Sequence, residues 1–277
     1  IVVDNNSSDK SVDIITNFMD KLPIVLLHEP KQGKNAALNT GLSIARGDLI
    51  IFTDDDIIPN TDWLTNYEKL LKTHLDYDLF GGRVEPYWQT LPNKYLLRDI
   101  PLVIAYATRD ESIPNGPCKA MTIFGPNMAV RKRVFEQGIT FNENIGPSGK
   151  NYIMGSESDF LVRAESSGFR AYFVTALNVK HIVRPFQLTD AWLENRAFKA
   201  GRATLHKDIT AGRKINRVKT WFGKPRWCVK KIMYLSFIYW LCRMFNLPQK
   251  YSILWRLYDT KGFSSEYKAL LSMGEIR

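Results

Sequence analysis

The chain has 277 residues, 45% of them apolar and 24% charged, which excludes a disordered chain and predicts one large folded domain, or a domain with an appendage. Its net charge of +10 is uneven: residues 180–277 hold 20 Lys and Arg against six Asp and Glu, whereas residues 1–179 carry a balance of −4. Three widely spaced cysteines, Cys118, Cys228 and Cys242, exclude a disulfide framework and a cysteine-based zinc site, and they favour a reducing compartment.

The apolar pattern predicts alternating strands and helices at the start of the chain. Strands are expected at 1–4, 23–28 and 48–53, separated by helices at 11–22 and 34–45. This order predicts an α/β fold with a mostly parallel sheet flanked by helices. Because the sequence begins inside a predicted strand, we expect that an opening N-terminal strand is missing.

The pattern continues with weaker alternation over the rest of the first 212 residues. Strands are predicted at 77–86, 123–130 and 170–179, and helices at 158–168 and 191–205. We therefore predict a catalytic domain over 1–212. Residues 213–277 are predicted to form a basic, aromatic-rich helical extension.

Three consecutive carboxylates, Asp54, Asp55 and Asp56, directly follow the strand predicted at 48–53. Ligands of such sheets bind beyond the carboxyl ends of the strands, and Asp4 ends the first strand in the same way. Mg²⁺ or Mn²⁺ would offset the repulsion within the triplet and leave positions open for phosphates. The alternatives are an acidic turn that caps the next helix and, for Asp4, an Asx turn or helix cap.

The segment GSESDFLVRAESSGF (155–169) places Glu157 near a helix start, where its carboxylate could accept a proton from a sugar hydroxyl. A residue that complements the helix dipole is the alternative. Asp159 and Arg163 lie four residues apart and are predicted to pair along the helix. Farther on, a set of basic residues is expected to grip a diphosphate, with His181 also able to reach a metal ion: His181, Arg184, Arg196 and Arg202.

The order of these pieces resembles the family 2 glycosyltransferases, which have the GT-A fold. The matching stretches are VVDNNSSD, GKNAALNTGLSIARGDLIIFTDDDIIPNTDWL, FGPNMAVRKRVFEQGITFNENIG and GSESDFLVRAESSGF, which span about 1 to 205. The resemblance implies an inverting transfer from a UDP-, GDP- or dTDP-sugar, assisted by Mg²⁺ or Mn²⁺. It also suggests a role in cell-surface polysaccharide or glycolipid synthesis, with a saccharide or lipid-linked acceptor.

By position, Asp4 resembles the nucleoside-binding Asp of the family, and Lys34 and Asn39 resemble residues near the nucleotide. Asp54 and Asp56 match the D-x-D pair, with Asp56 the expected metal ligand. The family's donor-sugar and acceptor pocket corresponds to Gly125, Asn127 and Asp159. Where the family usually has Glu-Asp, this chain has Ser156-Glu157, so Glu157 takes the place of the catalytic base with one additional methylene.

Two other readings of the sequence remain open. A sugar-phosphate nucleotidylyltransferase shares the α/β sheet and an Asp-held metal ion, and a non-catalytic, membrane-associated sugar-binding protein could retain the fold.

Residues 224–246 contain an apolar stretch of about 11 residues that is too short to cross a bilayer. Its flanking Lys and Arg and interspersed aromatic residues predict a helix on an anionic membrane surface, at the cytoplasmic face. Packing of this helix onto the catalytic domain is the alternative. No nucleic-acid motif accompanies the charge, so a nucleic-acid partner is not expected.

Overall fold

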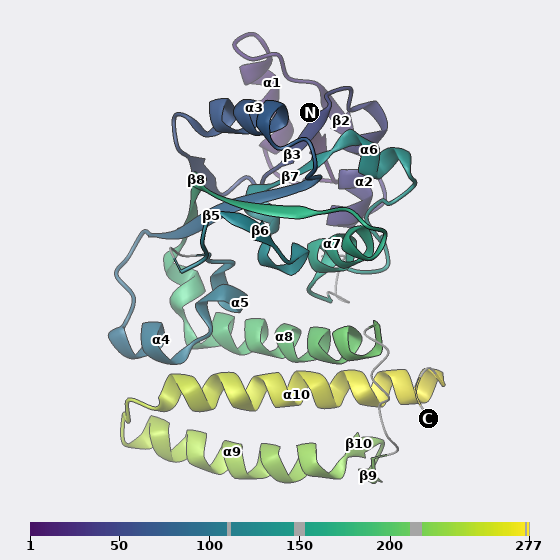
Figure 1. Cartoon of the computed structure of the whole chain (residues 1–277). Coiled ribbons are helices and arrows are strands. Elements are labelled where there is room, and N and C mark those ends of the chain that lie inside the picture. Colours follow the sequence, from purple (N-terminus) through teal and green to yellow (C-terminus); the bar gives the residue numbers. More distant parts are fainter. Residues whose placement is uncertain (110–111, 147–152, 211–217, 275, 277) are drawn as a thin grey trace. The chain divides into compact units, whose positions relative to one another are not determined.

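The computed structural model describes the chain except for residues 110–111, 147–152, 211–217, 275 and 277 (Figure 1). It divides into two compact units. The sheet unit comprises Ile1–Glu85 and Arg109–His181, and the helical unit comprises Pro86–Thr108 and Ile182–Arg277. The sequence had suggested a single boundary after residue 212, whereas here two separate chain segments build the helical unit.

The first elements of the sheet unit follow the predicted order. They are β1 (Val2–Asp4), α1 (Ser11–Met19), β2 (Leu26–His28), α2 (Lys34–Ile44) and β3 (Leu49–Phe52). β1 and β2 pair in parallel, as predicted, with Val2 opposite Leu26. β3 does not extend this pair, because it belongs to a separate sheet.

That larger sheet has the strand order β3-β7-β5-β8-β4, with β6 paired to β8. Its other strands are β4 (Ile57–Pro59), β5 (Leu79–Trp88), β6 (Gly116–Cys118), β7 (Met128–Arg131) and β8 (Ala171–Val183). The pairings β3–β7, β5–β7, β4–β8 and β6–β8 are antiparallel. The α/β class is therefore confirmed, but the strand direction differs from the mostly parallel sheet predicted. Buried strands have the same apolar pattern in either direction, so the sequence does not fix it.

Helices cover both faces of this sheet. On one face, Phe160 of α7 (Ser156–Ser166) packs in a core cluster with Phe52 and Leu79. On the other face, Tyr67 of α3 (Trp63–Thr73) packs in a cluster with Phe80. Adjacent strand residues such as Leu79 and Phe80 thus point to opposite faces, as the period of two in a strand requires. Short elements connect this framework: η1 (Ala120–Thr122), η2 (Gly125–Asn127) and α6 (Lys132–Glu136).

The helical unit is built on three long helices. They are α8 (Asp190–Thr210), α9 (Arg226–Met244) and α10 (Lys250–Met273), and α10 lies between the other two (Figure 1). Shorter elements complete it: α4 (Lys94–Asp99), α5 (Leu102–Tyr106), η3 (Pro185–Leu188) and a hairpin of β9 (Thr220–Trp221) and β10 (Lys224–Pro225). Among the described residues, none of the helices combines the length and the apolar character needed to cross a membrane.

Two glycines let the α8 and α10 backbones approach closely. A Cβ at Gly201 would lie 1.9 Å from the carbonyl oxygen of Asp259, and a Cβ at Gly262 would lie 1.9 Å from that of Phe198. Neither carbonyl can move without shifting a helix. The two helices can therefore pack at this distance because these positions carry no side chain.

Replacement of Gly262 by Ala should destabilise the protein by roughly 2 kcal/mol, since overpacking of a close backbone contact usually costs 1–3 kcal/mol. Gly41→Ala in α2 is the matched control, because its Cβ would meet nothing nearer than Val3 Cγ2 at 3.4 Å. Alanine also favours a helix over glycine, so that control should be as stable as the wild type or slightly more stable. Urea unfolding followed by circular dichroism measures both, and equal midpoints for Gly262→Ala and wild type would contradict the close packing.

Candidate functional site

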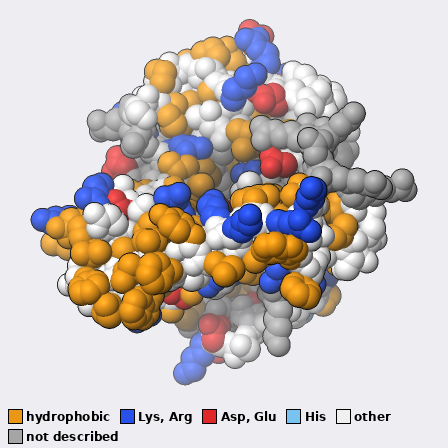
Figure 2. All heavy atoms as spheres, turned by 90° about the horizontal axis from the view of Figure 1, so that it is seen from below, with side chains coloured by type: hydrophobic (Ala, Val, Ile, Leu, Met, Phe, Trp, Pro, Cys, Tyr) orange, Lys and Arg blue, Asp and Glu red, His pale blue; other side chains and the backbone are white. Residues whose placement is uncertain are grey.

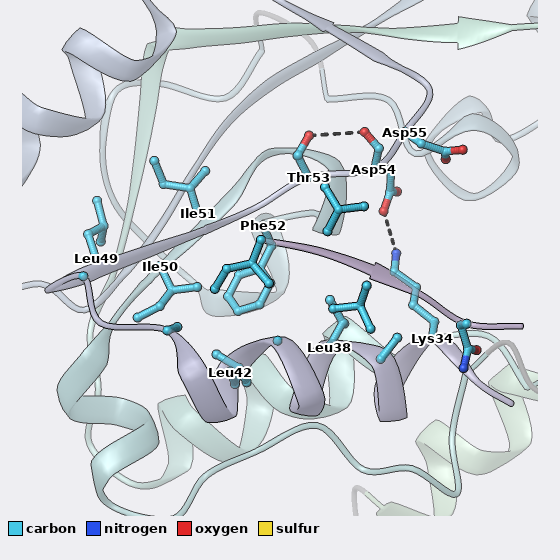
Figure 3. Close-up of a pocket in the computed structure, with 18 of the residues that line it drawn as sticks. Lys34, Leu38, Leu42, Leu49, Ile50, Ile51, Phe52, Thr53, Asp54 and Asp55 are labelled. Atoms are coloured by element: carbon cyan, nitrogen blue, oxygen red, sulfur yellow. Dashed lines mark hydrogen bonds and ion pairs between the residues drawn. The ribbon is translucent and has the colours of Figure 1, made fainter. Parts of the chain in front are cut away.

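The acidic triplet leaves the carboxyl end of β3, where Phe52 anchors the strand in the core. The side chains of Asp54 and Asp56 are about one quarter exposed, whereas Asp55 is exposed. In Figure 3, Asp54 points toward Lys34 of α2 and Asp55 points away from it. The three carboxylates therefore do not act as one group, and each faces a different environment.

Lys34 joins Asp54 to Glu157. Its Nζ lies 2.8 Å from Asp54 Oδ1 and 2.8 Å from Glu157 Oε1, and the three side chains are 29, 27 and 23% exposed. Burial would raise the pKa of the Glu157 carboxyl, but the adjacent Lys34 ammonium outweighs it and lowers that pKa to about 2. Burial would likewise lower the pKa of Lys34, but the two carboxylates raise it. Glu157 and Lys34 are thus both charged at neutral pH.

Glu157 is positioned by the first turn of α7 and by its neighbours. Gly155 before the helix has φ 111°, a conformation that favours glycine, and Ser156 Oγ donates to Glu157 Oε2 at 2.9 Å. Gly125 of η2 lies against the same carboxylate, since a Cβ there would come within 2.8 Å of Glu157 Oε1. The absence of a side chain at Gly125 provides the space that Glu157 occupies.

Asp56 and His181 form a second pair in the sheet unit. Ile57 of β4 lies opposite His181 of β8 in the antiparallel register, which brings the preceding Asp56 close to the imidazole. Asp56 Oδ2 lies 3.3 Å from His181 Nε2. Of the three predicted metal ligands, the structure thus brings Asp56 and His181 into contact, whereas Asp54 pairs with Lys34.

These residues fit a cation that is shared with a substrate. Among the described residues, no group of three or more His, Cys, Asp or Glu side chains is arranged to hold a metal ion. Asp56 and His181 offer two adjacent donor atoms, and both side chains are partly accessible. Mg²⁺ is commonly bound by one or two carboxylates together with substrate phosphates, so two protein donors are sufficient for such a site.

A pocket of about 850 Å³ adjoins the acidic triplet. It is bounded by β1, α2 and β3, and it reaches Lys34 and the residues from Asp54 to Asp56 (Figure 3). Leu38, Leu42 and Ile50 contribute apolar walls. β1 and β3 belong to different sheets, and the pocket lies where both of these strands contribute to its lining.

Residues after β1 position the start of α2 beside this pocket. Asn5 Oδ1 accepts a hydrogen bond from the backbone N–H of Gly33 at 2.7 Å, and Asn5 Nδ2 donates to Glu29 O at 2.8 Å. Gly33 has φ 144° and directly precedes Lys34, so this contact sets where the helix begins. Asn5 was not among the site residues predicted from the sequence. The feature of the sequence that could have indicated Asn5 is its position in the polar turn directly after β1.

Asp4 is buried at the end of β1, and its carboxylate serves the local turn. Asp4 Oδ1 accepts from Ser7 N at 3.2 Å, and Asp4 Oδ2 lies 3.1 Å from His28 Nδ1. The Ser7 and His28 contacts lower the pKa of Asp4. The structure thus displays the turn that the sequence analysis had kept as an alternative, and contact of Asp4 with a nucleoside stays a prediction.

Asn127 lies in the interior and is not among the residues that line the pocket beside the acidic triplet, so its place in a sugar pocket stays a prediction. It is fully buried, with Trp63 Nε1 and Tyr67 Oη both donating to its Oδ1 at 2.9 Å. Its Nδ2 donates to the carbonyl oxygens of Arg83 and Leu177. These four bonds occupy the amide, so its role is to join α3, β5 and β8.

Asn39, predicted near the nucleotide, and Asp159, predicted in the sugar pocket, also have structural partners. Asn39 Nδ2 donates to Phe141 O at 2.9 Å, and Asn39 Oδ1 accepts from Phe141 N at 3.1 Å, which ties α2 to the segment after α6. Asp159 pairs with Arg163 at 2.9 Å, which confirms the predicted pairing along the helix. Direct contact of either residue with a ligand stays a prediction.

The three predicted diphosphate-binding arginines belong to the helical unit. Arg202 pairs with the buried Glu266, and Arg196 Nε donates to Ile104 O at 3.2 Å. Arg202 thus neutralises a buried carboxylate, and diphosphate binding by Arg202 stays a prediction. Arg184 is exposed, and its backbone N–H donates to Gln187 Oε1 at the start of η3. Phosphate binding by Arg184 stays a prediction.

Comparison with known proteins identifies the family. The model of glycosyl transferase family 2 matches residues 1–139, half of the chain. The chain belongs to this family. Glycosyltransferase AglE of Haloferax volcanii is 29% identical over 209 residues, which cover 74% of this chain and 62% of AglE. The dolichyl-phosphate beta-glucosyltransferase ALG5C of Trichomonas vaginalis is 40% identical over 75 residues, which cover 26% of this chain and 22% of that protein. The chain thus spans less than two thirds of the length of these relatives.

Solved structures show the same fold at low sequence identity. The mannosyltransferase PcManGT from Pyrobaculum calidifontis, determined with GDP-Man and Mn²⁺, gives a TM-score of 0.52 at 18% identity, covering 99% of this chain and 69% of PcManGT. The structure of residues 1–349 of S. aureus TarS gives a TM-score of 0.50 at 13% identity, covering 99% of this chain and 81% of that TarS chain. These similarities confirm the predicted GT-A fold of this family 2 member.

The Lys34–Glu157 contact should make stability depend on pH in a defined window. The pKa of Glu157 falls from its ordinary 4.5 to about 2 on folding, so the contact stabilises the folded protein above about pH 4.5 and is lost as the pH falls toward 2. The difference in melting temperature between wild type and Glu157→Gln should therefore be largest near neutral pH and shrink below pH 4.5.

Glu68→Gln is the control, because Glu68 pairs with Lys72 on an exposed surface of α3, where an ion pair contributes little. Its melting temperature should follow that of the wild type at every pH. A Glu157→Gln difference that stays constant with pH would show that the ion pair is not formed.

Proposed function

We propose that this family 2 member transfers a sugar from a nucleotide-diphosphate-sugar to an acceptor hydroxyl, with inversion at the anomeric carbon. The observation that carries the proposal is the contact of Asp54 and Glu157 with one ammonium, because it joins the acidic triplet to the candidate base in one site. The fold similarity to PcManGT, whose structure holds GDP-Man and Mn²⁺, supports a nucleotide-sugar donor and a divalent cation. Glycosyltransferase relatives support the same reaction class.

Glu157 is proposed as the base. Its carboxylate takes the proton of the acceptor hydroxyl while the acceptor oxygen forms a bond to the anomeric carbon from one side. The bond from that carbon to the diphosphate oxygen breaks on the opposite side, so a single displacement inverts the centre. Glu157 must be unprotonated to act, and its pKa of about 2 keeps it so at neutral pH.

A carboxylate with so low a pKa is a weak proton acceptor, and Lys34 is the cause. The donor diphosphate is negatively charged and competes with Glu157 for the Lys34 ammonium. We propose that donor binding draws Lys34 away from Glu157, which raises the pKa of the carboxyl toward its ordinary value. Donor binding thus prepares the base for the acceptor.

Asp56 and His181 are the residues that would hold Mg²⁺ or Mn²⁺ together with the donor phosphates. A bound cation supplies charge neutralisation to the leaving diphosphate. Asp55 and the exposed Arg184 are kept as proposed donor contacts. The acceptor is proposed to be a saccharide or a lipid-linked group, since the Trichomonas relative is named for a dolichyl-phosphate acceptor.

Glu157→Gln should reduce sugar transfer by at least about a thousandfold, because the amide cannot take the proton. Donor binding should weaken by less than about tenfold, since the amide retains the shape of the side chain. Transfer from a panel of UDP-, GDP- and dTDP-sugars measures the first quantity, and calorimetry with the donor measures the second. Turnover near the wild-type level in this variant would eliminate Glu157 as the base. Wild-type protein that binds a donor tightly without transferring or hydrolysing it would favour a sugar-binding protein.

Asp56→Asn should remove the effect of metal on donor binding. In a thermal-shift screen, we expect the wild type to be stabilised by one class of nucleotide-sugar more strongly with Mn²⁺ than with EDTA. The variant should show the same small shift with Mn²⁺ and with EDTA. Glu68→Asn, on the exposed face of α3, is the control and should behave as the wild type. A metal-dependent shift that persists in Asp56→Asn would place the cation elsewhere.

A further inference from the structure

Helix α9 has two apolar faces that point in opposite directions. One face packs on α10 and holds the buried residues Cys228, Leu235, Tyr239 and Cys242. The other face holds exposed residues at the spacing of a single helical stripe: Met233, Tyr234, Phe237, Trp240 and Met244. Met233, Phe237 and Trp240 are 67, 58 and 56% exposed. Five large apolar or aromatic side chains on one outer face are more than scattered surface exposure.

The hairpin before α9 adds aromatic side chains next to the first turn of the helix. Trp221 lies in β9, and Phe222 at the turn is 94% exposed. Phe222 also has φ 52°, a left-handed conformation that is unfavourable for an aromatic residue. The turn therefore holds a large apolar side chain in solvent at a conformational cost, and no packing within the described part of the protein offsets it.

The charge around this face has one sign. Residues 219–250 contain seven Lys and Arg and no Asp or Glu. Arg226 and Lys230 are exposed and continue the outer stripe toward the N-terminus of α9, and Lys224 lies in the hairpin. Figure 2 shows apolar and basic side chains gathered together on the surface seen from below, over these elements.

Three acidic residues of the helical unit have partners within that unit. Glu194 of α8 accepts from Tyr239 Oη at 3.3 Å, Asp190 pairs with Lys250 at 3.1 Å, and Glu266 pairs with Arg202. These three acidic groups are thus engaged within the unit, whereas the exposed Lys224, Arg226 and Lys230 adjoin the outer apolar stripe.

We infer that the outer face of α9 and the adjoining hairpin turn bind the surface of a bilayer that contains anionic lipids. Trp and Tyr side chains favour the interface between headgroups and acyl chains, and Lys and Arg are attracted to anionic headgroups. A helix lying in the interface needs a buried apolar face and flanking basic residues, and α9 presents both while its inner face stays on α10. A second copy of the chain fits poorly, because it would bring two basic faces together. Membrane binding at this surface requires none of Asp54, Asp56 and Glu157, so its failure and the failure of the transfer reaction are distinguishable.

Flotation with lipid vesicles tests this surface. The full chain should bind vesicles of phosphatidylcholine mixed with phosphatidylglycerol, bind pure phosphatidylcholine at least about tenfold more weakly, and lose binding as salt is raised. The double variant Phe237→Ser/Trp240→Ser should lower binding to the anionic vesicles by about tenfold or more, because it removes two inserted side chains. The double variant Lys224→Glu/Lys230→Glu should lower it by a similar factor, since it reverses charge at the same face.

Matched controls lie in the sheet unit: on α3, in the loop that follows it, and directly before α1. Leu64→Ser/Leu75→Ser removes two exposed apolar side chains, each 64% exposed, and Lys10→Glu/Lys69→Glu makes the same change in net charge as the Lys224/Lys230 variant. Both controls should bind vesicles as the wild type does. Circular dichroism establishes that all variants are folded, as expected for exposed positions.

Two results would overturn the inference. One is equal vesicle binding by the α9 variants and the controls. The other is wild-type protein that binds neither vesicle but self-associates, with self-association lost in Phe237→Ser/Trp240→Ser, which would make this face an interface between copies of the chain.

Discussion

The Lys34 ammonium is the interaction on which the site depends. Without a cation between them, Asp54 and Glu157 would repel each other in a partly buried space. One ammonium against two carboxylates still leaves an excess of negative charge, to which Asp55 and Asp56 add. The Lys34 ammonium thus holds the two carboxylates together, and the remaining negative charge of the site can still attract a second cation. This balance explains why a single lysine at the start of α2 can organise groups from β3 and α7.

Local sequence patterns were sufficient to identify the side chains that could bind a cation or transfer a proton. Asp54–Asp56 directly follow an apolar strand, and Glu157 lies in the first turn of a helix, so each could be assigned from a few neighbouring residues. The same holds for most strands and helices of the sheet unit. Lys34 was expected near a nucleotide, but its bridge to Glu157 depends on how α2 and α7 pack, which no local pattern contains.

Two residues predicted to bind a ligand have structural partners, and their residue type suits either role. Asn127 has the amide that a sugar pocket needs, but the same amide satisfies four interior hydrogen bonds. Arg202 has a guanidinium group, which can bind phosphate, but in this structure it pairs with the carboxylate of the buried Glu266. In both cases the partner lies far away in the sequence. The direction of the sheet strands was not predicted correctly for a related reason. The apolar pattern of a buried strand is the same whether its neighbour is parallel or antiparallel. Asn5 was not predicted because its side chain hydrogen-bonds to backbone groups of Gly33 and Glu29. Residue type alone does not distinguish such an asparagine from any other asparagine in a turn.

The close contact of Gly125 with Glu157 has an evolutionary consequence. The side chains at positions 125 and 157 share one limited volume. Glycine at position 125 leaves room for glutamate at position 157. The shorter aspartate at position 157 would leave room for the methyl group of alanine at position 125. The two positions should therefore change together, so that glycine at 125 occurs with glutamate at 157, and alanine at 125 occurs with aspartate at 157. A lineage that altered either residue alone would have to tolerate a displaced carboxylate or a gap.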